Sequence, residues 1–430
     1  MRVPPRAPTG EPAHHRRFRR FFASLGPGLI TGAADDDPSG ISTYSVAGAT
    51  FGYSTLWTAL FSFPLMAAVQ LMCARLGLVT GLGLAGVIRR RYPPWVTWFA
   101  CALLGIANTI NIAADLGGMA ETTALVTHVP TTAWLPIYTV AIVAALVWTS
   151  YRTIARIFKW LTLVLGAYVI TAFLTAVDWP TALRTTFVPR IAWTREYFSV
   201  LVAIFGTTIS PYLFFWQAAQ EVEEERAMGR NLRQRQGATP DELRDCRTDV
   251  VTGMFVSNVI MFFIMLTTAA TLHASGRSSI TSAREASEAL RPLAGDAAYW
   301  LFTLGIIGTG MLAVPILAGS VAYAISEAAA WRQGTLAAQP RRAKKFYAVM
   351  GVAMAMGWAV TFVGFNAIRL LFVTAIINGV LAPPLVLIIV LLTSDREVMG
   401  EAVNPRILRW LGWATFAVMT AAACGLLIGS

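Results

Sequence analysis

The chain has 430 residues, of which 56% are hydrophobic and 13% are charged, and its mean hydropathy is +0.59. Soluble domains carry about a quarter charged residues, so these values exclude an ordinary soluble enzyme. The net charge of +11 also occurs in nucleic-acid-binding proteins, but here the basic residues lie between apolar blocks, as in membrane proteins. We therefore expect an all-α integral membrane protein without a nucleic-acid partner.

The apolar residues form blocks about 18 to 25 residues long, the length that spans roughly 30 Å of hydrocarbon. Residues 1–24 are rich in arginine and precede the first block, without a signal-peptide cleavage site. They predict a cytoplasmic tail, and residues 25–430 predict a single transmembrane domain. The eleven expected spans run near 25–49, 53–79, 95–126, 131–150, 154–177, 196–222, 249–273, 297–330, 345–363, 367–393 and 405–428.

The basic residues between the spans predict the orientation of the chain. Lysines and arginines are concentrated in the tail and in alternate loops, which places them on one side of the membrane. Such an excess marks the cytoplasmic side. We therefore expect the cell inner (plasma) membrane as the location, with the N-terminus in the cytoplasm and the C-terminus outside.

The first span is interrupted at residues 34–40, which read ADDDPSG. Carboxylates such as Asp36 and Asp37 are costly at this depth and normally face a functional cavity. Pro38 and Gly40 predict that the helix unwinds here. Adjacent helical side chains differ by about 100°, so at most two of the three aspartates can face one ion. The alternative is a loop between two short helices with solvated aspartates.

The sixth span is interrupted where Thr207 and Ser210 precede Pro211. Thr207 and Ser210 offer carbonyl and hydroxyl oxygens. Gln217 and Glu221 continue a polar stripe that indicates a vestibule for cations, although the glutamates of this region also fit the start of a charged loop. The two breaks open successive groups of five spans. This pattern predicts two inverted repeats, about 25–177 and 196–393, and an extra helix at 405–428.

The third span carries Asn108, Asn111 and Asp115 on one helix face. This acid with its amides would relay protons, support an ion site or hydrogen-bond between helices, and the sequence leaves these roles open. The chain shows no phosphate-binding loop, nucleophile motif or metal-ligating cysteine pattern. We therefore expect a protein that is not an enzyme and holds no cofactor.

At its two breaks the chain resembles the Nramp family of divalent metal transporters. Residues 37–40 (DPSG) stand where the family has DPGN, and residues 47–54, 74–81 and 393–396 are also family-like. The resemblance extends from residue 26 to the last span. It implies the amino-acid/sodium-symporter type of fold, with two inverted five-helix repeats and broken helices one and six.

The resemblance also implies a metal site at these breaks. It assigns Asp37 as the carboxylate ligand and Ala34 and Thr207 as carbonyl donors. Gly40 and Ser210 stand where the family has asparagine and methionine ligands. Loss of the thioether leaves oxygen ligands, which suit Mg²⁺, Ca²⁺ or Mn²⁺, and the wider site suits a partly hydrated Mg²⁺. In this respect the chain resembles the Nramp-related magnesium transporter branch more than manganese or iron carriers.

The residues expected to carry protons also depart from the family. Asp115 matches a family aspartate, but Gly118 stands where a glutamate would follow and Tyr212 replaces a histidine. We therefore expect weak or no proton coupling. A membrane potential of about 100 mV would favour entry of a divalent ion by about 4.6 kcal/mol.

The sequence leaves three alternatives open. The first is a proton-coupled Mn²⁺ or Fe²⁺ transporter of the same family. The second is a sodium-coupled amino-acid carrier, although Asp37 and its neighbouring aspartates would repel a substrate carboxylate. The third is a membrane receptor that transports nothing. The expected partners are the transported cation and the lipid bilayer, with no obligatory protein partner.

Overall fold

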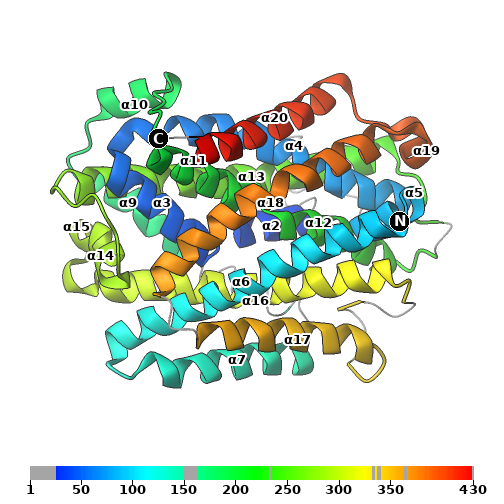
Figure 1. Cartoon of the computed structure of the whole chain (residues 1–430), viewed down its shortest axis with the longest axis horizontal. Helices are drawn as coiled ribbons and strands as arrows, with labels where there is room; N and C mark the ends of the chain where they lie inside the picture. Colours follow the sequence, from blue (N-terminus) through cyan, green and yellow to red (C-terminus); the bar gives the residue numbers. More distant parts are fainter. Residues whose placement is uncertain are drawn as a thin grey trace, which may run out of the picture.

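The computed structural model describes residues 26–149, 153, 163–231, 234–331, 335–336, 340–362 and 366–428, and all regular elements in these ranges are helices. The helices, labelled as in Figure 1, are α2 (Pro27–Asp35), α3 (Pro38–Phe51), α4 (Trp57–Thr80), α5 (Leu84–Arg91), α6 (Pro94–Thr127), α7 (Thr131–Trp148), α9 (Gly166–Leu174), α10 (Trp179–Phe187), α11 (Arg195–Thr208), α12 (Pro211–Ala227), α13 (Pro240–Thr268), α14 (Ala283–Ser287), α15 (Arg291–Ala294), α16 (Ala298–Ala328), α17 (Lys344–Thr361), α18 (Ala367–Ser394), α19 (Arg396–Met399) and α20 (Arg406–Ile428).

Both expected breaks are confirmed. The first span divides into α2 and α3, and the sixth divides into α11 and α12. Pro38 and Pro211 occupy the first position of the second half-helix in each pair, where a missing N–H removes no helical hydrogen bond. Each break therefore presents the carbonyls that end one half-helix beside the start of the next.

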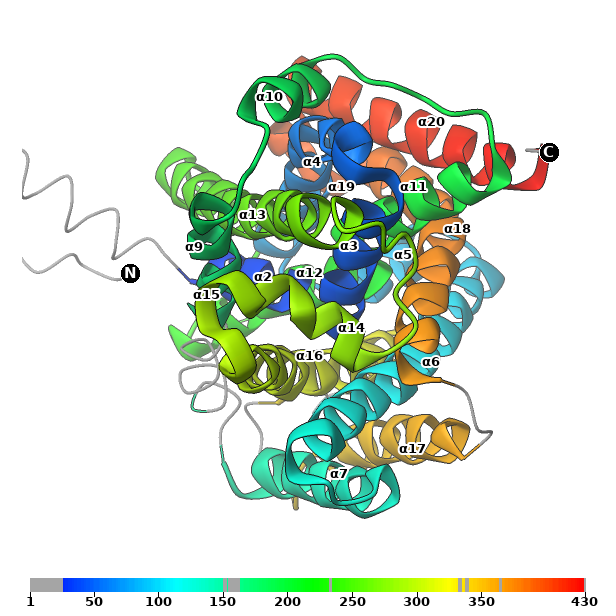
Figure 2. The same ribbon diagram turned by 90° about the vertical axis from the view of Figure 1, so that its left-hand side faces the viewer.

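The broken helices lie in the middle of the molecule. In Figure 2, α2, α3 and α12 are surrounded by α4, α6, α11, α13, α16 and α18. Helices α7 and α17 form an outer layer against α6 and α16, and α20 packs on α18 and α11. The irregular backbone at the breaks is thus enclosed by complete helices, as a membrane requires of any backbone that is not fully hydrogen-bonded.

Glycines bring the inner helices into close contact. A Cβ atom added to Gly28 would lie 2.7 Å from the Cα atom of Val250, and one added to Gly32 would overlap the backbone of Gly253. Gly206 and Gly379 allow α11 and α18 the same approach. Because lipid supplies no hydrophobic drive for helix association, membrane helices depend on such close packing. Helix α2 therefore fits α13 without space for a side chain.

Among the described residues, eight helical segments are long and apolar enough to cross a membrane, and they correspond to eight of the eleven expected spans. The first expected span is the broken pair α2 and α3. The fifth lies partly outside the described residues, and α9 is part of its described remainder. The ninth corresponds to α17, which begins with two lysines and is not one of the eight segments. The count of eleven crossings, the inverted symmetry of the repeats and the boundary at residue 25 remain predictions.

The outer helices carry exposed apolar side chains. On a soluble protein such a surface would indicate an interaction site, and here it fits contact with lipid. These side chains include Ile137, Val140 and Trp148 on α7, Val352 and Met356 on α17, and Ile407, Trp410 and Leu427 on α20.

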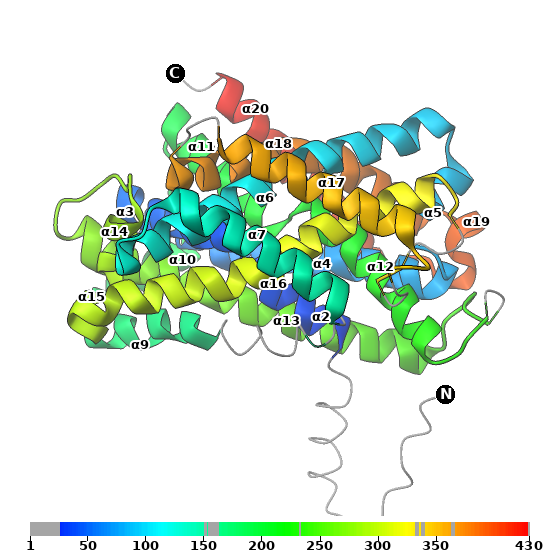
Figure 3. The same ribbon diagram turned by 90° about the horizontal axis from the view of Figure 1, so that it is seen from below.

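Two loops that we expected on the cytoplasmic side meet at one end of the molecule. Figures 1 and 3 show α5 and α19 at this end, with α14 and α15 at the other. Arg91 joins the two loops, because its Nε atom lies 2.7 Å from Oδ2 of Asp395. The hydrogen bond and charge of Arg91 lower the pKa of the Asp395 carboxyl. The loops share a face as expected, and the assignment of that face to the cytoplasm remains a prediction.

Candidate metal-transport site

Asp37 lies between the two halves of the first broken helix and caps the second half. Its Oδ1 atom accepts hydrogen bonds from the Ser39 hydroxyl at 2.6 Å and from the Gly40 N–H at 2.7 Å. Its Oδ2 atom faces α12 and lies 3.3 Å from the hydroxyl of Tyr212. One carboxylate oxygen is thus held within α3, while the other is directed across the site.

The Tyr212 hydroxyl lies between two expected ligands. It is 2.9 Å from the carbonyl oxygen of Ala34 and 3.3 Å from Oδ2 of Asp37. A phenol has one proton to donate, so it cannot fully satisfy both acceptors. A cation near this hydroxyl would attract both oxygens. The fold therefore brings the Ala34 carbonyl oxygen and the Asp37 carboxylate close to the same point, beside the Tyr212 hydroxyl.

The second break contributes oxygens that are bonded within their own helix. The Ser210 hydroxyl donates to the Thr207 carbonyl at 2.5 Å and lies 2.9 Å from the carbonyl of Gly206. The Thr207 hydroxyl lies 3.2 Å from the hydroxyl of Tyr44 on α3, which ties the two broken helices together. Both Thr207 and Ser210 are buried. A cation that used the Thr207 carbonyl would therefore compete with Ser210 or share the oxygen with it.

Gly40 supplies space and a backbone N–H. A Cβ atom at this position would lie 3.5 Å from Oδ1 of Asp37 and 3.4 Å from the carbonyl of Asp35. A longer side chain here would fill the space beside the carboxylate. The glycine therefore keeps the surroundings of Asp37 open, although it offers no side-chain ligand of its own.

Asp35 and Asp36 face a different helix from Asp37. The Ser257 hydroxyl of α13 lies 2.7 Å from Oδ2 of Asp35 and 3.2 Å from Oδ1 of Asp36. Both aspartates are buried, and one hydroxyl proton serves two carboxylates. Of the three aspartates, Asp37 is therefore the one whose carboxylate meets Tyr212, while Asp36 lies on the α13 side of the break.

Further buried polar groups lie on α6 and α18. Asp115 interacts electrostatically with Asp37 and Tyr212. The side chains of Asp115, Asn111 and Asn378 have no hydrogen-bond partner among the described residues. Helices α6 and α18 pack together and run in opposite directions (Figure 1). Because buried polar groups normally find partners, these atoms are suited to bind the waters of a hydrated ion.

Helix α12 extends this polar region toward the end that carries α5. Gln217 accepts a hydrogen bond from Thr31 of α2 at 2.5 Å and donates to Glu221 at 2.9 Å. Both Gln217 and Glu221 are buried. The stripe that we expected to line a vestibule is therefore closed over by α2 in this conformation.

Asp249 of α13 also holds α2 in place. Its carboxylate accepts hydrogen bonds from the backbone N–H groups of Gly26, Gly28 and Leu29, at distances of 2.8, 2.7 and 3.1 Å. A carboxylate at a helix N-terminus satisfies unpaired N–H groups and complements the helix dipole. Helix α2 is thus fixed to α13 at its start and to α12 through Thr31.

Within the described ranges, no group of three or more His, Cys, Asp or Glu side chains is placed to hold a metal ion. A site at the breaks would therefore combine the single carboxylate of Asp37 with carbonyl, hydroxyl and water oxygens. This donor set suits hard cations, for which oxygen is the preferred ligand atom.

Residues 28–429 match the Nramp family, described as natural resistance-associated macrophage protein-like. The chain belongs to the Nramp family. It is similar to the divalent metal cation transporter MntH of Aeromonas hydrophila, with 26% identity over 92% of this chain and 93% of that protein. It is also similar to MntH 1 of Pseudomonas aeruginosa, again with 26% identity, over 97% of this chain and 93% of that one.

Solved structures share the fold. A manganese transporter from Eremococcus coleocola aligns with a TM-score of 0.74 at 18% identity, over 96% of this chain and 87% of that one. Mhp1, a nucleobase-cation-symport-1 family transporter, aligns with a TM-score of 0.54 at 12% identity, over 94% and 92% of the two chains. These likenesses confirm the expected fold class.

Several residues around the breaks were not found from the sequence. Tyr44 and Ser257 lie on helices distant in sequence from their partners, and single hydroxyl residues in apolar helices give no signal. Asn378 is an isolated amide between apolar residues of the tenth span, a pattern that predicts a structural hydrogen bond. Its side chain has no such partner among the described residues.

Proposed function

We propose that this Nramp-family protein is a secondary transporter that carries a divalent metal cation across the membrane by alternating access. The main support is the position beside the Tyr212 hydroxyl, where the carboxylate of Asp37 and the carbonyl of Ala34 come together at the break between α2 and α3. The names of the A. hydrophila and P. aeruginosa relatives, which are divalent metal cation transporters, support the same substrate class.

We infer that Mg²⁺ is the preferred ion and that Mn²⁺ is also accepted. The proposed protein ligands are Asp37, Ala34 and Thr207, with Ser210 adding a hydroxyl and Gly40 leaving room. Asp115, Asn111 and Asn378 would bind water of the incoming ion. Mg²⁺ dehydrates reluctantly and usually keeps several waters, so a site with one carboxylate and unpaired amides nearby suits it.

A Mn²⁺ or Fe²⁺ transporter is the second candidate. The solved relative from E. coleocola is a manganese transporter, and Mn²⁺ accepts oxygen ligands. Against a preference for these metals stands Ser210, which provides no thioether. Proton coupling separates the two readings further, because Gly118 and Tyr212 cannot replace a glutamate and a histidine as proton carriers at neutral pH.

The other transport class is disfavoured by Asp37. A sodium-coupled amino-acid carrier would offer the free N-terminus of a half-helix to the substrate carboxylate. Here the N-terminus of α3 is already capped by the Asp37 carboxylate. An anionic substrate group would meet a negative charge at this position.

The test is uptake into liposomes that contain the purified protein, with Mg²⁺, Mn²⁺ and internal pH recorded together. We expect Mg²⁺ influx that is driven by an inside-negative potential, is lost in Asp37→Ala and causes no acidification. Asp241→Ala is the control, because this aspartate is exposed on α13 and pairs loosely with Arg244. Mn²⁺ influx with acidification and no Mg²⁺ signal would establish the second candidate. No flux of either ion would leave a protein that does not transport metal.

A further inference from the structure

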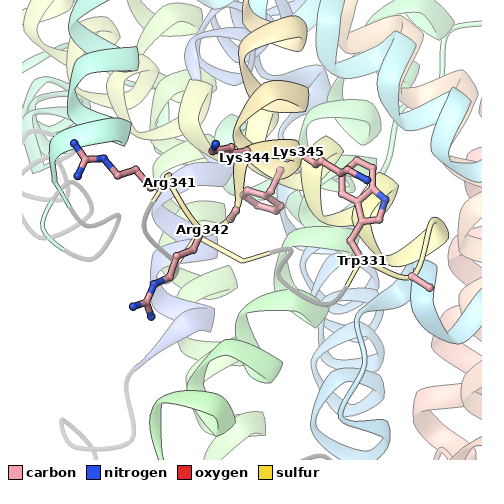
Figure 4. A pocket seen from close by; sticks show the side chains of 8 residues that line it. Trp331, Arg341, Arg342, Lys344 and Lys345 are labelled. Atoms are coloured by element: carbon pink, nitrogen blue, oxygen red, sulfur yellow. The ribbon is translucent and has the colours of Figure 1, made fainter.

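A cavity of about 470 Å³ opens where α16 ends and α17 begins. Figure 4 shows Trp331 just after α16, Lys344 and Lys345 at the start of α17, and Arg341 and Arg342 on the segment that precedes α17. Among the described residues, the lining combines two aromatic rings and four positive charges and includes no acidic side chain. Its residues are Ala330, Trp331, Arg341, Arg342, Ala343, Lys344, Lys345 and Phe346.

The positive charges of this cavity are not neutralised by the described part of the protein. Elsewhere, Arg91 and Arg230 each pair with carboxylates. None of the four basic residues of the cavity forms an ion pair with a described residue. Lys345 instead places its Nζ atom 5.7 Å from the centre of the Trp331 ring. In Figure 4, Arg341 and Arg342 extend outward from the cavity, while Lys345 points toward Trp331. The positive charge, unpaired among the described residues, therefore covers the cavity and its rim, where it attracts an anion.

The cavity lies at a boundary of the membrane-spanning region. Glu327, close to the end of α16, accepts a hydrogen bond from the Gly86 N–H of α5 at 3.1 Å. The cavity therefore shares the end of the molecule that carries α5 and α19 (Figure 1). Tryptophan is enriched at the level of lipid headgroups, which fits Trp331 at this position.

One face of α17 joins the cavity to the lipid-facing surface. Val352 and Met356 follow Lys345 by seven and eleven residues, so the three side chains share one side of the helix. Val352 is 57% exposed and Met356 is 52% exposed. The same helix face thus offers a cation at the membrane boundary and an apolar strip that continues into the hydrocarbon region. This arrangement matches a phospholipid, whose charged headgroup would meet the cation and whose acyl chain would lie along the apolar strip.

We propose that the cavity binds the phosphate headgroup of an anionic phospholipid whose acyl chain lies along the exposed face of α17. Arginine and lysine both recognise phosphate, arginine through paired N–H groups and lysine as a compact charge. Basic pockets between membrane helices are suited to anionic headgroups. The site is separate from the metal-transport site, and its occupancy does not depend on which ion is carried.

The test uses the full-length protein in detergent, incubated with equal amounts of phosphatidylglycerol and phosphatidylcholine, and native mass spectrometry of the retained lipid. We expect preferential retention of phosphatidylglycerol by the wild type. The double variants R341Q/R342Q and K344Q/K345Q should each reduce this preference about 25-fold, at about fivefold per removed charge. The control R406Q/R409Q removes two exposed charges at the start of α20 and should retain the preference.

A second arm separates lipid from free phosphate. Inorganic phosphate is added at constant ionic strength, and we expect no displacement of phosphatidylglycerol, because phosphate alone lacks the acyl contact with α17. Displacement by phosphate would mean that the cavity takes the free anion and would overturn the lipid assignment. Equal retention of the two lipids, or an undiminished preference in both cavity variants when they migrate as folded monodisperse protein, would overturn the site itself.

Discussion

The carboxylate of Asp249 holds the start of α2 against α13 through three N–H groups. Asp249→Ala removes all three hydrogen bonds. Loss of a helix N-cap costs about 0.5–2 kcal/mol, and each hydrogen bond to a charged group is worth about 1.5–3 kcal/mol. Because the released N–H groups regain water when α2 leaves α13, we expect a net loss of about 2 kcal/mol. The population with α2 detached should then rise about 30-fold.

Cys246 provides a native reporter for this opening. It lies one helical turn before Asp249 on α13, and it is only 8% exposed. Cys73 and Cys101 are buried as well, while Cys424 is exposed and is replaced by serine. Cys246 lies beside Asp249 and beside Glu221 and Glu224 of α12, the helix that α2 contacts through Thr31. In the Cys424→Ser background, the rate of maleimide labelling at Cys246 reports opening of this region of α13. We expect the rate in Asp249→Ala to rise by up to about 30-fold, if labelling follows the open population.

Two further variants sharpen the result. Asp249→Asn keeps one acceptor oxygen without the charge and should give an intermediate rate. Asp241→Ala removes an exposed carboxylate from the same helix and should leave the rate unchanged. An unchanged labelling rate in a folded Asp249→Ala protein would refute the reasoning, because it would show that the glycine contacts with α13 hold α2 without the carboxylate.

Three other predictions concern packing, the ion site and pH. Gly32→Ala forces a methyl group into the backbone of α13 and should lower metal uptake about tenfold or more. Gly105→Ala places its Cβ atom in open space and should leave uptake unchanged. Tyr212→Phe removes the hydroxyl at the ion site and should change the KM for the metal about five- to tenfold in uptake assays, while Tyr138→Phe, which loses a bond to a threonine away from the breaks, should leave it unchanged. Arg91 lowers the pKa of Asp395, so their ion pair is complete above the unfolded-state pKa of about 3.9 and is lost as pH falls through the lower folded-state pKa. Protease cleavage between α18 and α20 should therefore increase in acid. In Asp395→Asn, cleavage should already be high at pH 7.

The sequence determined the broken helices because their causes are local. A proline disfavours helical geometry in the residue before it, and polar residues before it offer the chain local alternatives to a helix. Prolines that follow apolar residues, such as Pro64 and Pro315, lie inside helices here. The structure accordingly begins α3 at Pro38 and α12 at Pro211. Hydrophobic length likewise fixed the membrane class, since a helix long enough to span hydrocarbon needs no tertiary partner to be recognised.

Only the tertiary structure decided which oxygens meet. The sequence could state that three adjacent aspartates point in different directions, but not that Asp37 faces Tyr212 while Asp35 and Asp36 share Ser257. These pairings join residues about 175 to 222 positions apart. They depend on glycine contacts that set the separation of α2 and α13, and a contact between two backbones leaves no pattern in either helix alone.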